Sequence, residues 1–260
     1  MEHDTMGEVA VPADRYWGAQ TQRSFENFPI GTEKMPTEII RAFGLLKKAA
    51  AQANATLCPT RMTAERCSAI CRACDEVISG TLDGHFPLAV WQTGSGTQTN
   101  MNANEVIANR AIEILGGVKG DYSIVHPNDH VNRAQSTNDV IPTAAKLTVA
   151  KLLRGAIEQV TRLRDALADK KREFHNIIKM GRTQMQDAVP IRLGAEFGAY
   201  SRAITRDIQR MEVALEEMYT INLGGTAVGT ALNANPVYVS LLAPTLSRIC
   251  ELPLQKADDL

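Results

Sequence analysis

Short polar side chains gather directly before predicted helices at three places in the sequence. The first cluster is Gln135–Asp139, and residues 95–100 and 182–186 form two more. A helix N-terminus presents unpaired N–H groups and a partial positive charge, so hydroxyls and amides there can bind a carboxylate or a phosphate. Such residues are also favoured helix caps, which explains any one cluster taken alone. Three clusters together, with Gly94 and Gly96 allowing close backbone approach, favour an anion-binding site.

Rigid helices are needed to position these clusters, and helical patterns dominate the chain. Apolar periodicity predicts helices over residues 38–57, 62–80, 101–117, about 139–174 and 193–218. The third of these ends at the pair Gly116–Gly117, and the fourth carries Pro142 in its expected first turn. From Leu193 to Met218, apolar residues recur at steps of three and four, which is typical of a bundle seam.

The predicted fold class is therefore all-α, with a small β element near the N-terminus. Alternation in the stretch VAVPA, residues 9–13, suggests that element. No linker rich in Ser or Pro divides the chain. A Gly-rich polar segment at residues 116–135 is the expected domain boundary.

Composition limits the partners that the chain can take. Lys and Arg number 28 against 29 Asp and Glu, so nothing favours binding to nucleic acid or to an anionic membrane. The first residues lack the pattern of a signal peptide, and no run is as long and apolar as a membrane helix. The five cysteines are an odd number, which indicates reduced thiols. We therefore expect a cytoplasmic protein that binds a small molecule.

Two sets of residues have spacings that suggest metal ligands. Cys67, Cys71 and Cys74 show the C-x3-C-x2-C spacing of iron–sulfur loops, but they lie on the apolar stripe of a predicted helix and are interpreted as core. His126 and His130 are four apart, and Pro127 argues against one shared helical face. We expect neither a metal nor a cofactor.

Several segments resemble the aspartase/fumarase superfamily. They are GSGTQTNMNANEV, HPNDHVNRAQSTNDVIPT and GRTQMQDAVPIRLG, with DTMGEVAVPADRYWGAQTQRSFENFPIG and INLGGTAVGTALNANP extending the likeness over essentially the whole chain. The resemblance implies an all-α, L-aspartase-like fold, with an N-terminal lyase domain at 1–134 and an incomplete central helical bundle at 135–260. It further implies a homotetramer with active sites shared between subunits, and elimination from a four-carbon dicarboxylate to give fumarate.

The resemblance also implies roles for individual residues. The carboxylates and the leaving group would be held by Ser95, Thr97, Ser136, Thr137, Asn138, Thr183 and Gln184. An accessory anion site would be formed by His126, Asn128 and Asp129. The family's catalytic base is a Ser in a loop of the form G-S-S-x-M-P-x-K-x-N-P. Residues 1–260 contain no such segment. The catalytic residue is thus unknown, the loop is expected beyond Leu260, and the chain resembles an N-terminal portion.

The leaving group is the finest distinction that the sequence offers. DTMGEV, WGAQTQRS and QTGSGTQ are similar to the hydratases of the superfamily, while QSTND, GRTQ and KADDL are similar to its ammonia-lyases. Gln184 stands where the hydratases usually carry His, and an amide cannot change protonation state as an imidazole can. We therefore favour elimination of ammonia from L-aspartate. Dehydration of malate and a non-catalytic binding role stay as alternatives.

Overall fold

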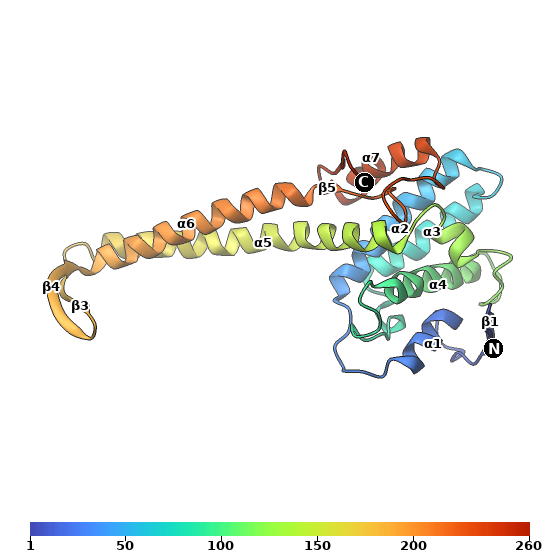
Figure 1. The fold of residues 1–260 in the computed structure, drawn as a ribbon, viewed down its shortest axis with the longest axis horizontal. Helices are drawn as coiled ribbons and strands as arrows, with labels where there is room; N and C mark the ends of the chain where they lie inside the picture. Colours follow the sequence, from blue (N-terminus) through green and yellow to red (C-terminus); the bar gives the residue numbers. More distant parts are fainter. The chain divides into compact units, whose positions relative to one another are not determined.

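Helices dominate the computed structural model, which describes residues 1–260 (Figure 1). The α-helices are α1 (Ala19–Asn27), α2 (Thr37–Leu57), α3 (Ala64–Ser79), α4 (Thr97–Ile114), α5 (Thr137–Glu173), α6 (Leu193–Met218) and α7 (Pro236–Cys250). Two short helical turns are η1 (Asp83–His85) and η2 (Pro127–Val131). The predicted all-α class and the five predicted helices are confirmed, whereas α1 and α7 were not predicted.

The strands form three small pairs. β1 (Glu2–Asp4) and β2 (Gly7–Val9) form an antiparallel hairpin near the N-terminus, as expected, but it precedes the VAVPA stretch, of which only Val9 lies in a strand. β3 (Ile178–Thr183) and β4 (Gln186–Arg192) form a second antiparallel hairpin. The short strands β5 (Thr220–Ile221) and β6 (Gln255–Lys256) pair in parallel.

Contacts divide the chain into two compact units. The first comprises Met1–Thr148 and Tyr219–Leu260, and the second is Val149–Met218. In the first unit, α2 packs against both α3 and α7, and α3 packs against α4. Fully buried apolar side chains at these contacts include Phe43, Leu46, Ile70, Ile107 and Leu242. The domain division expected between residues 134 and 135 stays a prediction.

Helix α3 shows how local signals set the helix boundaries. The Thr63 side chain accepts a hydrogen bond from the Arg66 N–H as N-cap, and Gly80 ends the helix at φ 86°. Burial corrects the predicted stripe in part, because Cys74 is fully buried while Cys67 and Cys71 are only half-buried. The inner face lies along the Ile70 side of the helix, which turns the first two thiols toward its edge.

The start of α5 corrects the expected position of Pro142. Because α5 begins at Thr137, the proline lies in the second turn, where its missing N–H leaves the Asn138 carbonyl without its helical donor. The Asn222 side chain supplies a replacement, with Nδ2 3.3 Å from Asn138 O. A distant segment thus satisfies the carbonyl that the proline leaves without its helical donor.

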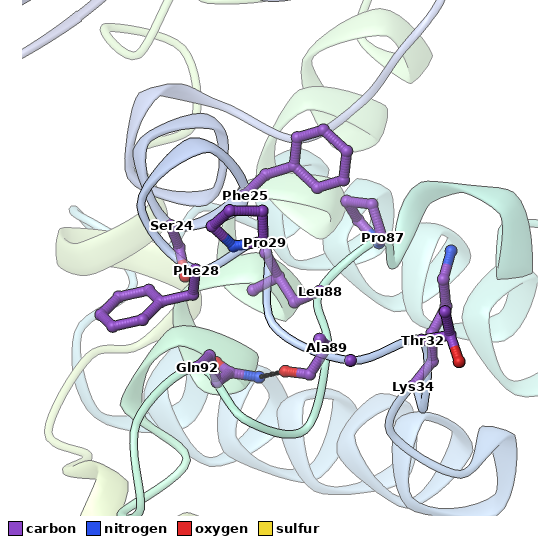
Figure 2. A pocket seen from close by; sticks show the side chains of 11 residues that line it. Ser24, Phe25, Phe28, Pro29, Thr32, Lys34, Pro87, Leu88, Ala89 and Gln92 are labelled. Atoms are coloured by element: carbon purple, nitrogen blue, oxygen red, sulfur yellow. Dashed lines mark hydrogen bonds between the residues drawn. The ribbon is translucent and has the colours of Figure 1, made fainter.

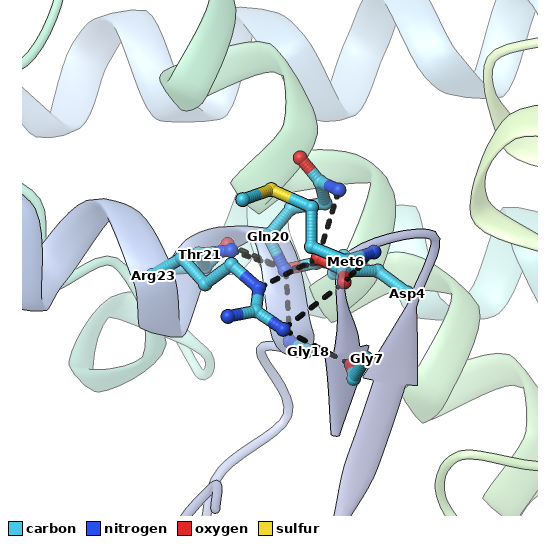
Figure 3. A network of polar contacts seen from close by, with 8 residues as sticks. Asp4, Met6, Gly7, Gly18, Gln20, Thr21 and Arg23 are labelled. Atoms are coloured by element: carbon cyan, nitrogen blue, oxygen red, sulfur yellow. Dashed lines mark hydrogen bonds and ion pairs between the residues drawn. The ribbon is translucent and has the colours of Figure 1, made fainter. Parts of the chain in front are cut away.

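Polar contacts tie the N-terminal hairpin to α1, as Figure 3 shows. Arg23 donates from Nε (2.9 Å) and Nη2 (3.1 Å) to the Asp4 carboxylate, which also accepts from Met6 N at 2.8 Å and Gln20 Nε2 at 3.1 Å. Arg23 further donates to Gly7 O at 3.0 Å. These bonds hold the Asp4 pKa below its usual value, chiefly through Arg23, and fix the hairpin to the helix.

A buried carboxylate from α4 caps the start of α1. Glu105 accepts from the backbone N–H groups of Gly18, Gln20 and Thr21 at 2.8–3.0 Å, and from the Thr21 hydroxyl at 2.6 Å. A negative charge is favoured at a helix N-terminus. This carboxylate therefore joins α1 to α4, whose own start carries the second polar cluster.

The second unit corrects the third predicted helix N-terminus. Residues 182–186 were expected to precede a helix directly, but they form the end of β3 and the turn into β4. Gln184 and Met185 occupy the turn at φ 51° and 61°, as a two-residue hairpin turn of the mirror-image type requires. Helix α6 begins only at Leu193. The hydroxyl and amides of this cluster therefore lie at a hairpin tip.

Candidate active site

The first polar cluster forms the N-terminus of α5. Ser136 is the N-cap, since its Oγ accepts from Asn138 N at 3.3 Å, and its own N–H donates to Asp139 Oδ1 at 3.0 Å. The bond from Ser136 N to the Asp139 side chain is one half of a capping box, while the Ser136 hydroxyl caps the N–H one residue earlier. Asn138 turns its side chain outward and donates to Ala227 O at 2.6 Å. Capping thus accounts for Ser136 and Asp139, while the half-buried Thr137 and the exposed Asn138 have no capping role.

Asp139 is fully buried, and its carboxylate joins two segments. Its second oxygen accepts from Gly224 N at 3.1 Å and Thr226 N at 3.0 Å, so the segment after α6 closes over the start of α5. Burial raises the pKa of this carboxyl, and the three backbone bonds together with the Lys47 charge oppose the increase. Sequence reasoning placed Asp139 in the cluster but assigned it no role.

The second cluster lies at the N-terminus of α4, beside the first. Gly96 is the N-cap at φ 75°, Thr97 is the first helical residue, and the Ser95 and Thr97 hydroxyls are 3.1 Å apart. A Cβ on Gly96 would lie only 2.7 Å from Ile141 Cδ1 on α5. The glycine therefore permits a close approach of the two helix starts, and Ser95 and Thr97 lie in the same region as Ser136, Thr137 and Asn138.

A buried lysine that sequence reasoning missed lies behind these two clusters. Lys47 on α2 is 0% exposed, and its Nζ donates to Asn100 Oδ1 at 2.7 Å, Asn132 Oδ1 at 2.9 Å and Gln135 Oε1 at 2.8 Å. A signal was present in the sequence, because Lys47 falls four residues after the buried Phe43, on the apolar face of α2.

The predicted accessory anion residues lie on and next to η2. His126 Nδ1 accepts from the backbone N–H groups of Asn128 (3.1 Å) and Asp129 (3.2 Å), whose side chains are exposed. His130 Nδ1 accepts from His126 N at 2.8 Å, and burial lowers the His130 pKa to about 4. His126 and Asn128 line a cavity of about 240 Å³ that Tyr122 also borders. The three predicted residues of the accessory anion site therefore lie together, and the side chains of Asn128 and Asp129 are exposed to solvent.

Thr183 and Gln184 belong to the second compact unit. Both are exposed at the β3–β4 turn, next to an ion pair between Arg182 Nε and Asp187 Oδ1 at 3.0 Å. Their place relative to the first unit's residues stays a prediction.

A further cavity of about 400 Å³ lies between the end of α1 and residues 87–92, as Figure 2 shows. Its lining includes Phe25, Phe28 and Gln92. Gln92 donates from Nε2 to Ala89 O at 3.1 Å and to Thr99 Oγ1 at 2.8 Å. None of the predicted site residues lines this cavity. Gln92 connects it to the first turn of α4 through the bond to Thr99.

No group of three or more His, Cys, Asp or Glu side chains is arranged to hold a metal ion. All five cysteines are free thiols. None of the helices is sufficiently long and apolar to span a membrane.

The sequence matches a known protein family and several named relatives. The sequence model of a family described as "Lyase" matches residues 7–260. Mitochondrial fumarate hydratase of Rhizopus oryzae is 54% identical over 259 residues, which cover 98% of this chain and 52% of that protein. Class II fumarate hydratase of Neisseria meningitidis is 51% identical over 257 residues, covering 98% of this chain and 55% of that protein. The chain thus spans about half the length of the curated relatives that it matches.

Solved structures agree with this placement. The fumarate lyase:delta crystallin of Brucella melitensis matches with a TM-score of 0.94 and 44% identity, over 100% of this chain and 56% of that one. The class II fumarase of Schistosoma mansoni matches with a TM-score of 0.93 and 38% identity, over 99% of this chain and 57% of that one.

Proposed function

Since the chain belongs to this lyase family, within the aspartase/fumarase superfamily, we propose that it carries substrate-binding segments of a class II fumarate hydratase. The observation that carries the proposal is the identity of about half of all residues with proteins named as fumarate hydratases. These relatives favour dehydration of malate over elimination of ammonia from aspartate, the reaction that Gln184 favours. The substrate class is in either case a four-carbon dicarboxylate.

The adjacent starts of α4 and α5 suit such a substrate. Two carboxylates need two groups of donors, and Thr97 with Ser95 would bind one. Thr137, Asn138 and the Ser136 O–H, whose oxygen accepts the capping bond, would bind the other. Gly96, packed against Ile141, supports this arrangement because it keeps the two helix starts close together. The donors are neutral, so they bind a dianion without adding a surplus of positive charge.

The chemistry is a reversible elimination. A base removes the proton from the carbon next to one carboxylate, which gives a doubly charged aci-carboxylate. The carbon–oxygen bond on the neighbouring carbon then breaks, the hydroxyl leaves as water after gaining a proton, and the carbon–carbon double bond of fumarate forms. Hydrogen bonds from the helix starts strengthen as charge accumulates on the aci-carboxylate, so they stabilise this state more than the substrate. No residue of 1–260 is proposed as the base.

One observation keeps deamination of aspartate as the second candidate. Gln184, exposed at the β3–β4 turn, offers an amide with fixed donors and acceptor where an imidazole would titrate near neutral pH. If a second subunit brings this turn to the site, the amide contacts the leaving group and bears on its identity.

Fumarate formation by the complete protein tests the proposal. Ultraviolet absorbance should show malate as the better substrate, with kcat/KM exceeding that for aspartate by at least about 100-fold, because a site built to hydrogen-bond one leaving group leaves polar groups unpaired with another. Faster turnover of aspartate would reverse the assignment. Turnover of neither substrate would support the binding role.

We further propose that the complete protein is a homotetramer with shared active sites. Of α6, only Gly194, Gly198 and Ile208 are buried within the chain, while Tyr200 on the apolar seam is 54% exposed and the other seam residues are half-buried. The α6 seam, Leu193–Met218, therefore has apolar surface available for helices of other subunits. Sedimentation equilibrium should give four times the chain mass, and a stable monomer would contradict both the tetramer and the shared site.

The expected cytoplasmic location stays a prediction, since the Rhizopus oryzae relative is named as mitochondrial.

A further inference from the structure

The hydrogen bonds of Lys47 use its full donor capacity. An ammonium has three N–H groups, and Lys47 Nζ contacts three amide oxygens at 2.7–2.9 Å. The side chain is completely buried, so no solvent supplements these bonds. A buried charge is tolerated only when such partners replace its hydration.

The three acceptors come from three different segments of the proposed site. Asn100 lies in the first turn of α4, three residues after Thr97. Asn132 directly follows η2, whose start carries the accessory residue His126. Gln135 immediately precedes Ser136, the N-cap of α5. Asn100 Nδ2 also donates to Asn132 Oδ1 at 3.3 Å, which closes the network.

The charged and titratable groups around Lys47 come from the packed helices. The Asp139 carboxylate on α5 favours the ammonium. Cys74 on α3 and Tyr238 on α7 are also close, but burial raises the pKa of both groups, so they stay neutral. Burial lowers the Lys47 pKa to about 7, against the opposing effect of Asp139. The three hydrogen bonds thus stabilise the ammonium at a site where burial has removed its hydration.

We propose that Lys47 is a positioning residue, whose buried ammonium holds the start of α4, the end of η2 and the N-cap of α5 in one fixed arrangement. The inference rests on the proposed function for the role of these segments, and it adds a residue that touches no substrate. A neutral amine has only two N–H donors, so loss of the proton releases at least one of the three segments. Protonation of Lys47 therefore sets the alkaline limit of the site.

Lys47→Met in the complete protein tests this role, because methionine has a similar length and carries no donor. We expect kcat/KM for malate to fall about 10- to 100-fold, mainly through kcat, because the donors at the starts of α4 and α5 are displaced and bind the transition state less well. The wild-type alkaline limb of the pH profile should vanish in the variant. Lys48→Met is the matched control, because Lys48 bonds only to the surface residue Asp75, at 2.6 Å, and its profile should match the wild type.

Asn132→Asp tests the same role without removing the lysine. The carboxylate keeps both acceptor positions and adds a negative charge beside Nζ, which favours the ammonium. The alkaline limb of kcat/KM should therefore move upward by about one pH unit. This variant also decides the question if Lys47→Met does not fold.

Hydrogen exchange without substrate separates this inference from the proposed function. Amides of residues 97–100 and 132–138 should exchange at least about tenfold faster in Lys47→Met, with α3 and α7 unchanged. This result would support the positioning role even if the wild type turned over neither malate nor aspartate. Unchanged exchange in these segments, or activity loss with an unaltered pH profile and an unmoved limb in Asn132→Asp, would overturn it.

Discussion

Alanine at Thr97, Ser136 or Thr183 in the complete protein is expected to lower kcat/KM by about 10²- to 10³-fold, the effect of removing one preorganised donor from a developing negative charge. The loss should fall on kcat more than on KM, because the hydrogen bonds are stronger to the aci-carboxylate than to the substrate. Steady-state kinetics with malate and fumarate measures both parameters. If the fumarate assay shows aspartate to be the better substrate, the variants are compared with the wild type on aspartate instead of malate.

The structure predicts different effects on stability for two of these substitutions. The Ser136 hydroxyl caps α5, so Ser136→Ala should also cost about 1 kcal/mol of folding free energy. Thr183 is exposed on β3, and its replacement should change stability by less than about 0.5 kcal/mol. Ser136→Gly restores most of the capping preference without the hydroxyl, and it should recover stability but not activity. Activity that follows stability across all four variants would show that the clusters act only as caps.

Asp139→Ala is expected to destabilise the protein by about 3–5 kcal/mol, the largest stability effect predicted for this chain. The change leaves the buried N–H of Gly224 and the part-buried N–H groups of Ser136 and Thr226 without their acceptor. It also removes the carboxylate that favours the buried ammonium of Lys47. Urea unfolding followed by circular dichroism measures the loss.

Asp129→Ala provides the control for this stability measurement. Its side chain is 75% exposed, so removal of the carboxylate should change the free energy of unfolding by less than about 0.5 kcal/mol. Asp139→Asn should fall between the two, because an amide keeps one acceptor oxygen and places a donor near the remaining N–H groups. Equal stability of the Asp139→Ala and Asp129→Ala variants would contradict the structural role of Asp139.

The helices could be predicted from the sequence because their signals are local. Apolar periodicity on α2, α3 and α6, and glycine at the ends of α3 and α4, act within a few residues of one another. The same locality limits what could be predicted. The tip of the β3–β4 hairpin holds polar residues that suit a helix start equally well, and the pairing of Thr183 with Gln186 decided between the two.

The sequence by itself also determined the superfamily and the place of Ser95, Thr97 and Ser136–Asn138 at helix starts, while their role in binding stays a prediction. Tertiary structure alone decided how those starts are joined. Lys47 meets Gln135 across 88 positions of sequence, and Asp139 meets Thr226 across 87. No local pattern encodes such pairs, because a buried charge finds its partners only when separate helices pack together and exclude water.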